Sequence, residues 1–258
     1  MKKYIILFVL FSTSPQLIFA ETPVMISQSQ TMNEIVLDGK WSFLEEWKNS
    51  SDYLIQYESG EILHFRSAHQ GDYVFFMINF LSDTTLNEDL DEAKICLSPI
   101  HENNSKSHLK SYCFVSVIGN EPSYILKQNS IDKENFEKVI SEPNYVAVAN
   151  ISDENDRYSK TPHLTHEFKI PTSLIERTSE YNLYVGVYDS DSNKLFNWPK
   201  NIPVTNPSEI PTLSLWGTMI SPDKTLPEFN LPFIILIILL SSIIILQKKF
   251  KMNINFQQ

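Results

Sequence analysis

The feature that most restricts the fold of this chain is a series of short apolar runs separated by polar turns. The runs are rich in Val, Ile, Tyr and Phe, which favour strands. Because many such runs follow one another with few helical stretches, they predict an all-β fold, an antiparallel β-sandwich of jelly-roll or immunoglobulin-like type. The predicted strands are 35–37, 62–66, 73–81, 93–97, 112–117, 145–149, 165–170 and 181–188, and short helices are predicted at 131–140 and 171–177.

One predicted strand, 73–81, is apolar on both faces. Successive side chains of a strand point to opposite sides, so Phe75 and Met77 share one face while Phe76 and Ile78 share the other. A strand of this kind is buried on both sides. We therefore expect 73–81 in the middle of a sheet.

The two ends of the chain have the pattern of an exported, membrane-anchored protein. Residues 1–20 combine two lysines, an apolar run and the small residue Ala20, the layout of a cleaved signal peptide. Residues 229–247 are almost wholly apolar and precede a basic tail at 248–258, which predicts one transmembrane segment with the tail inside. The expected location is the cell membrane, single-pass, with the N-terminal domain extracellular. Between the ends we expect a flexible lead-in at 21–33, the sandwich at 34–199 and a Pro-rich stalk at 200–228.

The formal net charge of −10 bears on the partners of the exterior domain. An acidic surface repels the phosphates of nucleic acid, so we expect no nucleic-acid partner. The same surface suits a solvated extracellular domain and can attract divalent cations.

Two cysteines, Cys96 and Cys113, lie in neighbouring strand-like runs of the exported region. An even number of cysteines in an oxidising compartment favours a disulfide, and two adjacent strands would bring this pair together. The alternative is a pair of buried free thiols. Three Asn-x-Ser patterns, at Asn49, Asn103 and Asn150, predict a glycoprotein if they are exposed.

The sequence contains none of the common catalytic motifs. It has no Gly-x-Ser-x-Gly, no glycine-rich phosphate loop and no His-Glu-x-x-His. Glu45 and Glu46 are adjacent in sequence and are not spaced like a glycosidase pair. We therefore expect a protein that is not an enzyme.

Two groups of residues have the chemistry of metal ligands, each with a simpler interpretation. His163 and His166 flank a strand start beside Glu167, but a metal site would need further ligands, and polar residues at a strand edge explain them as well. Asp189 and Asp191 offer alternating oxygen ligands, although a hairpin turn is the simpler interpretation because the glycine and glutamate of an EF-hand are missing.

Three segments together resemble the family 9 carbohydrate-binding modules and the related DOMON-like sandwiches, in a variant typical of archaeal surface proteins. They are 35–41 with Glu45-Glu46-Trp47, then 82–85 with 91–97, and finally 181–188 with Asn197-Trp198-Pro199. The resemblance covers about residues 34–199. It implies a β-sandwich that binds sugars without catalysis.

The resemblance also implies site residues. Such modules stack aromatic faces on sugar rings, and Trp41, Trp47 and Trp198 are the available indoles, unless they pack in the core. It allows a structural calcium at Asp38, where a turn residue is the alternative. Haem-binding relatives use a methionine ligand, which would be Met77 here unless it only fills the core.

The C-terminal tail is similar to a sorting signal read by archaeosortases, through Pro227, Glu228 and Phe229 before the apolar run. It departs from that signal at Asn230 and in continuing to Gln258, so a plain retained anchor is the alternative. Taken together, we expect a surface-displayed binding module for carbohydrate or another envelope component. The alternatives are a structural envelope protein without a ligand and a haem-binding redox module.

Overall fold

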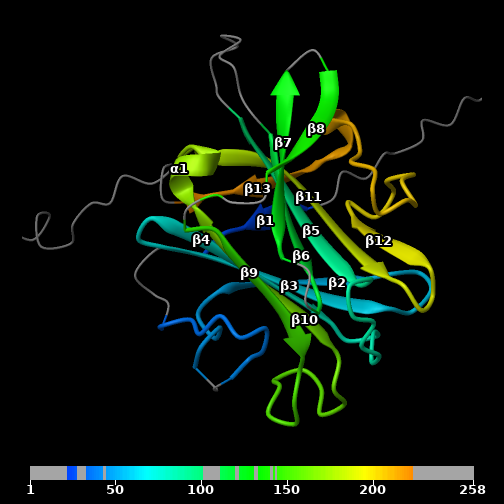
Figure 1. Ribbon diagram of the computed structural model, residues 1–258. Coiled ribbons are helices and arrows are strands. Elements are labelled where there is room, and N and C mark those ends of the chain that lie inside the picture. The colour runs from blue at the N-terminus through cyan, green and yellow to red at the C-terminus, as the bar shows by residue number, and fades with distance from the viewer. Residues whose placement is uncertain are drawn as a thin grey trace, which may run out of the picture.

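The computed structural model describes residues 22–27, 33–42, 45–100, 111–119, 122–130, 133–139, 142 and 144–222. Within them the chain forms two β-sheets packed face to face, which confirms the predicted sandwich (Figure 1). The predicted signal peptide, transmembrane segment, basic tail, Pro227-Glu228-Phe229 motif and Asn103 lie outside this part. In the part described, no helix is long and apolar enough to span a bilayer.

The smaller sheet is antiparallel and has β4 in its middle, as its two apolar faces predicted. Only the first residue of β4 is not fully buried. The strand order is β2 (Ser51–Gln56), β3 (Ile62–Gln70), β4 (Tyr73–Phe80), β10 (Leu164–Pro171) and β9 (Val146–Ile151).

The larger sheet is antiparallel except at one edge, where β1 and β13 run parallel. β12 pairs with β11 beyond the end of β13, so both lie along the same side of β11. The order is β1 (Val24–Met25), β13 (Gly217–Ile220), β11 (Glu180–Asp189), β5 (Glu92–Ile100), β6 (Tyr112–Val117), β7 (Tyr124–Ser130) and β8 (Lys133–Val139), with β12 (Lys194–Trp198) off this path. Among the described residues the helices are α1 (Thr172–Ile175) and one 3-10 turn, η1 (Leu213–Leu215).

Each sheet is covered on its outer face as well as on its inner one. Residues 33–42 and 45–50 lie over the smaller sheet, where Trp41 and Trp47 pack with Met77 of β4. Residues 199–216 lie over the larger sheet, where Ile202 and Trp216 pack on the outer side of β5 and β11. We call these segments the N-terminal cover and the C-terminal cover.

The covers correct the expected boundaries of the domain. The lead-in at 21–33 contains β1, and Ile26 beside it is 3% exposed. The described part of the expected stalk forms the C-terminal cover and β13, so it belongs to the sandwich. Residues 35–37 form no strand because they lie in the N-terminal cover. The helix expected at 131–140 is instead β8, which pairs with β7 in a hairpin.

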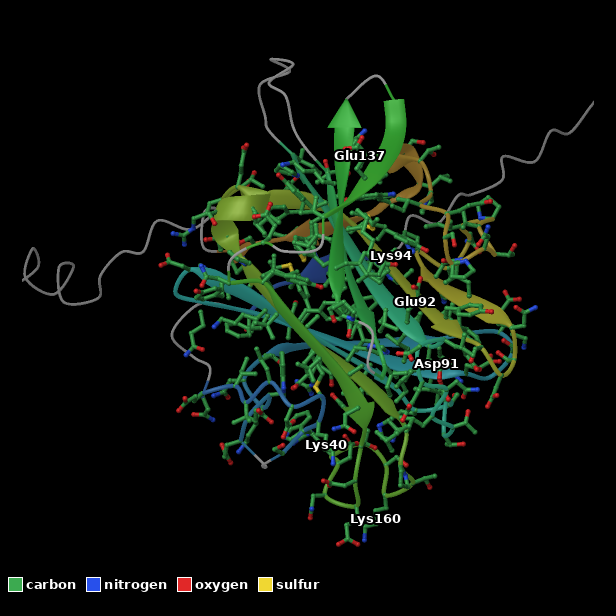
Figure 2. All side chains as sticks on the ribbon, in the orientation of Figure 1. Lys40, Asp91, Glu92, Lys94, Glu137 and Lys160 are labelled. Carbon is green, nitrogen blue, oxygen red and sulfur yellow. A yellow bond between two sulfur atoms is a disulfide. The ribbon has the colours of Figure 1, made fainter. Side chains whose placement is uncertain are left out.

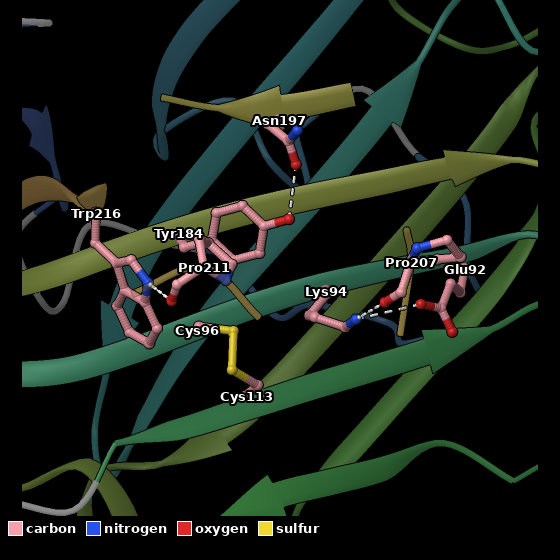
Figure 3. Close-up of a disulfide and its surroundings, with 9 residues drawn as sticks. All are labelled: Glu92, Lys94, Cys96, Cys113, Tyr184, Asn197, Pro207, Pro211 and Trp216. Carbon is pink, nitrogen blue, oxygen red and sulfur yellow. Dashed lines mark hydrogen bonds and ion pairs between the residues drawn. A yellow bond between two sulfur atoms is a disulfide. The ribbon is translucent and has the colours of Figure 1, made fainter. Parts of the chain in front are cut away.

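The predicted disulfide is confirmed between Cys96 of β5 and Cys113 of β6, which are direct partners in the strand register (Figure 3). Both cysteines are fully buried beneath the C-terminal cover, next to Tyr184 and Trp216. The cover is held there by Lys94, whose Nζ donates to the Pro207 carbonyl.

Replacing both cysteines by alanine should lower the free energy of unfolding by about 3 kcal/mol, the chain-entropy value for a loop of this size. For a domain of this length the melting temperature should fall by about 6–12 °C. Thermal unfolding of the oxidised protein and of the double variant measures the difference. A loss below about 1 kcal/mol would mean that packing, and not the bridge, holds β5 to β6.

Candidate functional site

All three tryptophans expected to bind sugar are core side chains in this structure. Trp41, Trp47 and Trp198 are 2%, 0% and 1% exposed. None presents an indole face to solvent, so their placement gives no support to the role we expected for them. Trp41 and Trp47 anchor the N-terminal cover, and Trp198 packs in the core between the sheets.

Glu167 of β10 is the attachment point of the N-terminal cover. Its Oε1 accepts a hydrogen bond from Trp47 Nε1 at 2.8 Å, and its Oε2 accepts from the backbone N–H groups of Asp38 at 3.0 Å and Gly39 at 2.8 Å. Glu46, also fully buried, accepts from two further backbone N–H groups of the same segment. Asp38 is therefore a turn residue of the cover and is not among the acidic groups that cluster elsewhere.

Burial raises the pKa of Glu167 from 4.5 to about 8, even though its hydrogen bonds act in the opposite direction. Because the folded state then holds its proton more tightly than the unfolded state, stability should fall as the pH rises from about 5 to 8. Chemical unfolding at several pH values tests this, with Glu167→Gln expected to show a shallower slope. An identical slope in that variant would assign the pH dependence of stability to other groups. Glu46 and Asp83 are the candidates, because burial raises the pKa of each of them as well.

The histidines considered as metal ligands are not brought together with Glu167. His166 points into the sandwich, where its Nδ1 lies 3.1 Å from Ser116 Oγ, and burial lowers its pKa to about 3. His163 lies on the other face, with its Nδ1 2.8 Å from the Thr161 carbonyl. Met77, the residue of the haem alternative, is fully buried under Trp41 and Trp47, a placement that gives that alternative no support.

A cluster of three carboxylates lies at one end of the sandwich. Asp83 follows β4, Asp91 precedes β5 and Asp189 ends β11, and their ligand oxygens all lie within 4.8 Å of one another. Asp83 and Asp91 are buried, at 2% and 0% exposure. Figure 2 labels Asp91 beside the turn that joins β11 to β12.

The hydrogen bonds of this cluster fix the carboxylates but leave one oxygen free. Asp91 accepts from the N–H groups of Asn87 and Ser190, and Asp83 Oδ1 accepts from Thr85. Asp83 Oδ2 is buried and has no hydrogen-bond partner among the described residues. Burial and the charges of Asp91 and Asp189 raise the pKa of Asp83 to about 6.

The chemistry of this donor set fits a hard divalent cation. Calcium takes six to eight oxygen ligands, carboxylates foremost, in flexible geometry. A buried carboxylate oxygen without a donor, close to two like charges, is costly unless a cation neutralises it. Of the expected metal residues only Asp189 belongs to the cluster. Asp191 is exposed and accepts from Thr85 and Asn87, which links the two loops beside it.

A second arrangement, which sequence reasoning missed, lies on the outer face of the smaller sheet where the N-terminal cover leaves β2 free. The rings of Tyr158 and His64 stack with centroids 3.6 Å apart. The Asp52 carboxylate accepts from His64 at 3.1 Å, from Arg66 Nη2 at 2.9 Å and from the Tyr158 hydroxyl at 3.1 Å. Leu54 beside His64 is 56% exposed. We call these five residues the platform.

The platform is rigid and charged at the same time. Arg66 is almost fully buried between the rings of Trp41 and Tyr158, so its position is fixed by packing. Burial acts to raise the pKa of Asp52, but the hydrogen bond from His64 and the charge of Arg66 outweigh it and hold that pKa below its usual range. The carboxylate is therefore ionised at neutral pH, with 37% of its side chain exposed.

The glycosylation patterns differ in their exposure. Asn49 is exposed in the N-terminal cover. Asn150 of β9 donates its Nδ2 to the Asp38 carbonyl at 3.2 Å, a bond that a glycan on that nitrogen would break. Asn49 is thus the better placed acceptor of the two.

Comparisons with known proteins give likenesses of shape only. No protein-family model matches the chain, and no curated protein matches its sequence. A family 9 carbohydrate-binding module from Caldicellulosiruptor kristjanssonii in complex with glucose is similar at a TM-score of 0.45 and 13% identity, over 78% of this chain and 95% of that one. The same kind of module in complex with cellotriose gives 0.41 and 13%, over 80% and 98%. A Bacteroides uniformis protein, provisionally described as carbohydrate-binding, gives 0.41 and 9%, over 67% and 85%.

Proposed function

We propose that this chain is a non-catalytic binding domain for carbohydrate, or for another hydroxyl-rich component of the cell envelope, displayed on the outer side of a membrane. The observation that carries the proposal is the platform. It places aromatic rings and an exposed leucine beside an ionised carboxylate whose position is already fixed by three donors.

These groups suit a sugar for two reasons. A pyranose has an apolar face of C–H groups that packs on flat or aliphatic side chains, and a rim of hydroxyls that donate to carboxylates. Because Asp52 and Tyr158 are held in place before binding, less conformational entropy is lost when the ligand arrives. Display outside a membrane is supported by the sequence pattern of residues 1–20 and 229–247.

We also propose that the three-carboxylate cluster holds a structural calcium ion. Asp83, Asp91 and Asp189 would be its ligands, and the ion would tie the loop 81–91 to the β11–β12 turn. Its chemistry is neutralisation of buried charge. Sugar binding would not involve this ion directly, because the platform lies on the outer face of the smaller sheet and the cluster lies at one end of the sandwich.

The platform predicts which substitutions weaken glycan binding. Screening the purified protein on a glycan array and titrating the best ligand should give at least a tenfold loss of affinity, about 1.4 kcal/mol, for Asp52→Asn and for Tyr158→Ala. Asp72→Asn is the matched control and should bind as wild type, because this exposed carboxylate lies in the β3–β4 turn and is not part of the platform. Melting curves of each variant check that the fold is kept.

Two results would count against this function. Unchanged affinity in both platform variants would place the sugar elsewhere on the domain. An array without any bound glycan, from protein that is folded and oxidised, would favour the alternative of a structural envelope protein with no ligand.

A further inference from the structure

The two ends of the sandwich differ in what they carry. At one end, which we call the α1 end, β13 finishes at Ile220 beside α1 and the β3–β4 turn (Figure 1). Backbone bonds join these pieces, from Ser221 N–H to the Ser179 carbonyl at 2.8 Å and from Thr172 N–H to the Asp72 carbonyl at 2.8 Å. The other end, the acidic end, contains the three-carboxylate cluster.

The described part of the chain ends at the α1 end, and the sequence from there to the predicted membrane span is short. Pro222 is the last described residue, and the apolar segment begins at 229. The seven Cα–Cα distances from residue 222 to residue 229 span at most about 25 Å when the chain is fully extended. Because the expected stalk has turned out to be the C-terminal cover and β13, no long spacer is left to hold the domain away from the bilayer.

The distribution of charge agrees with one orientation. The acidic end carries the cluster and, in the loops next to it, Glu88, Asp89, Asp153 and Glu154, against two exposed basic residues, Arg157 and Lys160. The α1 end exposes fewer charges, Arg177 together with Asp72, Glu176 and Glu180. A surface of anionic lipid therefore repels the acidic end more strongly than the α1 end.

We infer that the α1 end of the sandwich rests against the lipid headgroups, with the acidic end directed away from the membrane. The contact surface is formed by Asp72, Ser173, Glu176 and Arg177, and its partner is the headgroup layer of the bilayer that holds the chain. This inference depends on the proposed membrane anchor. It leaves the calcium cluster and the tip of the loop between β9 and β10 on the far side.

The test uses the full chain, reconstituted in vesicles of phosphatidylcholine and phosphatidylglycerol that contain a lipid with a spin-labelled headgroup. One thiol-reactive fluorophore is placed through Ser173→Cys on α1, and in a matched variant through Lys160→Cys at the opposite tip (Figure 2). Both positions are exposed, whereas the native cysteines are buried and bridged, so only the added thiol reacts.

We expect several-fold stronger quenching of the label at 173 than of the label at 160. Inserting a flexible glycine–serine linker of about 20 residues after Pro222 should remove most of that difference, because the tether then reaches roughly 25 Å or more beyond its native length. Equal or reversed quenching in protein that sediments with the vesicles would overturn the orientation. Protein that does not sediment with them would overturn the anchor as well, and neither outcome affects the glycan titration.

Discussion

Saturating Ca²⁺ should raise the melting temperature of this protein by about 5–10 °C at about pH 7.5. An ion present at a hundred times its dissociation constant stabilises the folded state by about 2.7 kcal/mol, and each kcal/mol moves the midpoint of a domain of this size by about 2–4 °C. The reason lies in the three carboxylates of Asp83, Asp91 and Asp189, of which two are buried and one has an oxygen without a donor.

The shift should depend on pH in a defined direction. Because the pKa of Asp83 is raised to about 6, protons compete with the cation below that value. At about pH 5 the calcium effect should therefore be much smaller. Without the ion, the raised pKa means that the cluster destabilises the fold as the pH rises from about 4 to 6.

Asp83→Asn provides the sharper test, since it should act in opposite directions with and without the metal. In chelator at neutral pH the variant should be more stable than wild type, because one of three crowded charges is gone. With Ca²⁺ it should lose most of the stabilisation. Asp191→Asn, beside the cluster but outside it, should keep the full response. Equal melting temperatures of wild type with Ca²⁺ and with chelator would exclude the proposed site.

Replacing Gly39 by alanine should lower the free energy of unfolding by about 2–5 kcal/mol, the largest effect we expect from adding a single methyl group. Gly39 has a φ of +77°, which costs a residue with a Cβ about 1–2 kcal/mol. A Cβ there would also lie 2.7 Å from Asn150 Cβ and 2.8 Å from the Ala149 carbonyl carbon, and overpacking of this kind costs about 1–3 kcal/mol.

Gly71→Ala separates the two contributions. Gly71 has a φ of +60°, but nothing lies within 4 Å of the position its Cβ would take, so this variant should show only the conformational cost. The difference between the two variants measures how closely the N-terminal cover is seated on β9. Urea unfolding followed by tryptophan fluorescence reports on both, because Trp41 and Trp47 belong to that cover and pack against the sheet. Equal losses in the two variants would show that the cover can shift to admit the methyl group.

The strands were predictable because their signal is local. The segment 181–188 alternates in polarity and is β11, and 73–81 is apolar on both faces and is the central β4. The pairing of Cys96 with Cys113 followed from two neighbouring runs in a region expected to be exported, and the strand register places them directly opposite.

The covers and the sites were not predictable in the same way, because they depend on contacts between distant parts of the chain. Trp41 and Trp47 are residues of the type that stacks on sugar rings. Only the fold shows that both pack against β3 and β4 and are buried. The carboxylates at 83 and 91 meet the one at 189 because β5 pairs with β11 over nine residue pairs. Tyr158 reaches His64 from a loop whose sequence has no periodic pattern.

The edge pair of β1 and β13 determines how the domain would bear mechanical load. If a ligand held at the surface pulls on the domain, the force leaves through Ile220 and runs nearly along β13. Hydrogen bonds of a sheet lie across the strands, so a pull along β13 loads its bonds to β11 and to β1 together instead of breaking them one after another. A four-residue strand held from both sides in this geometry resists extension better than an unpaired stalk, which would simply straighten.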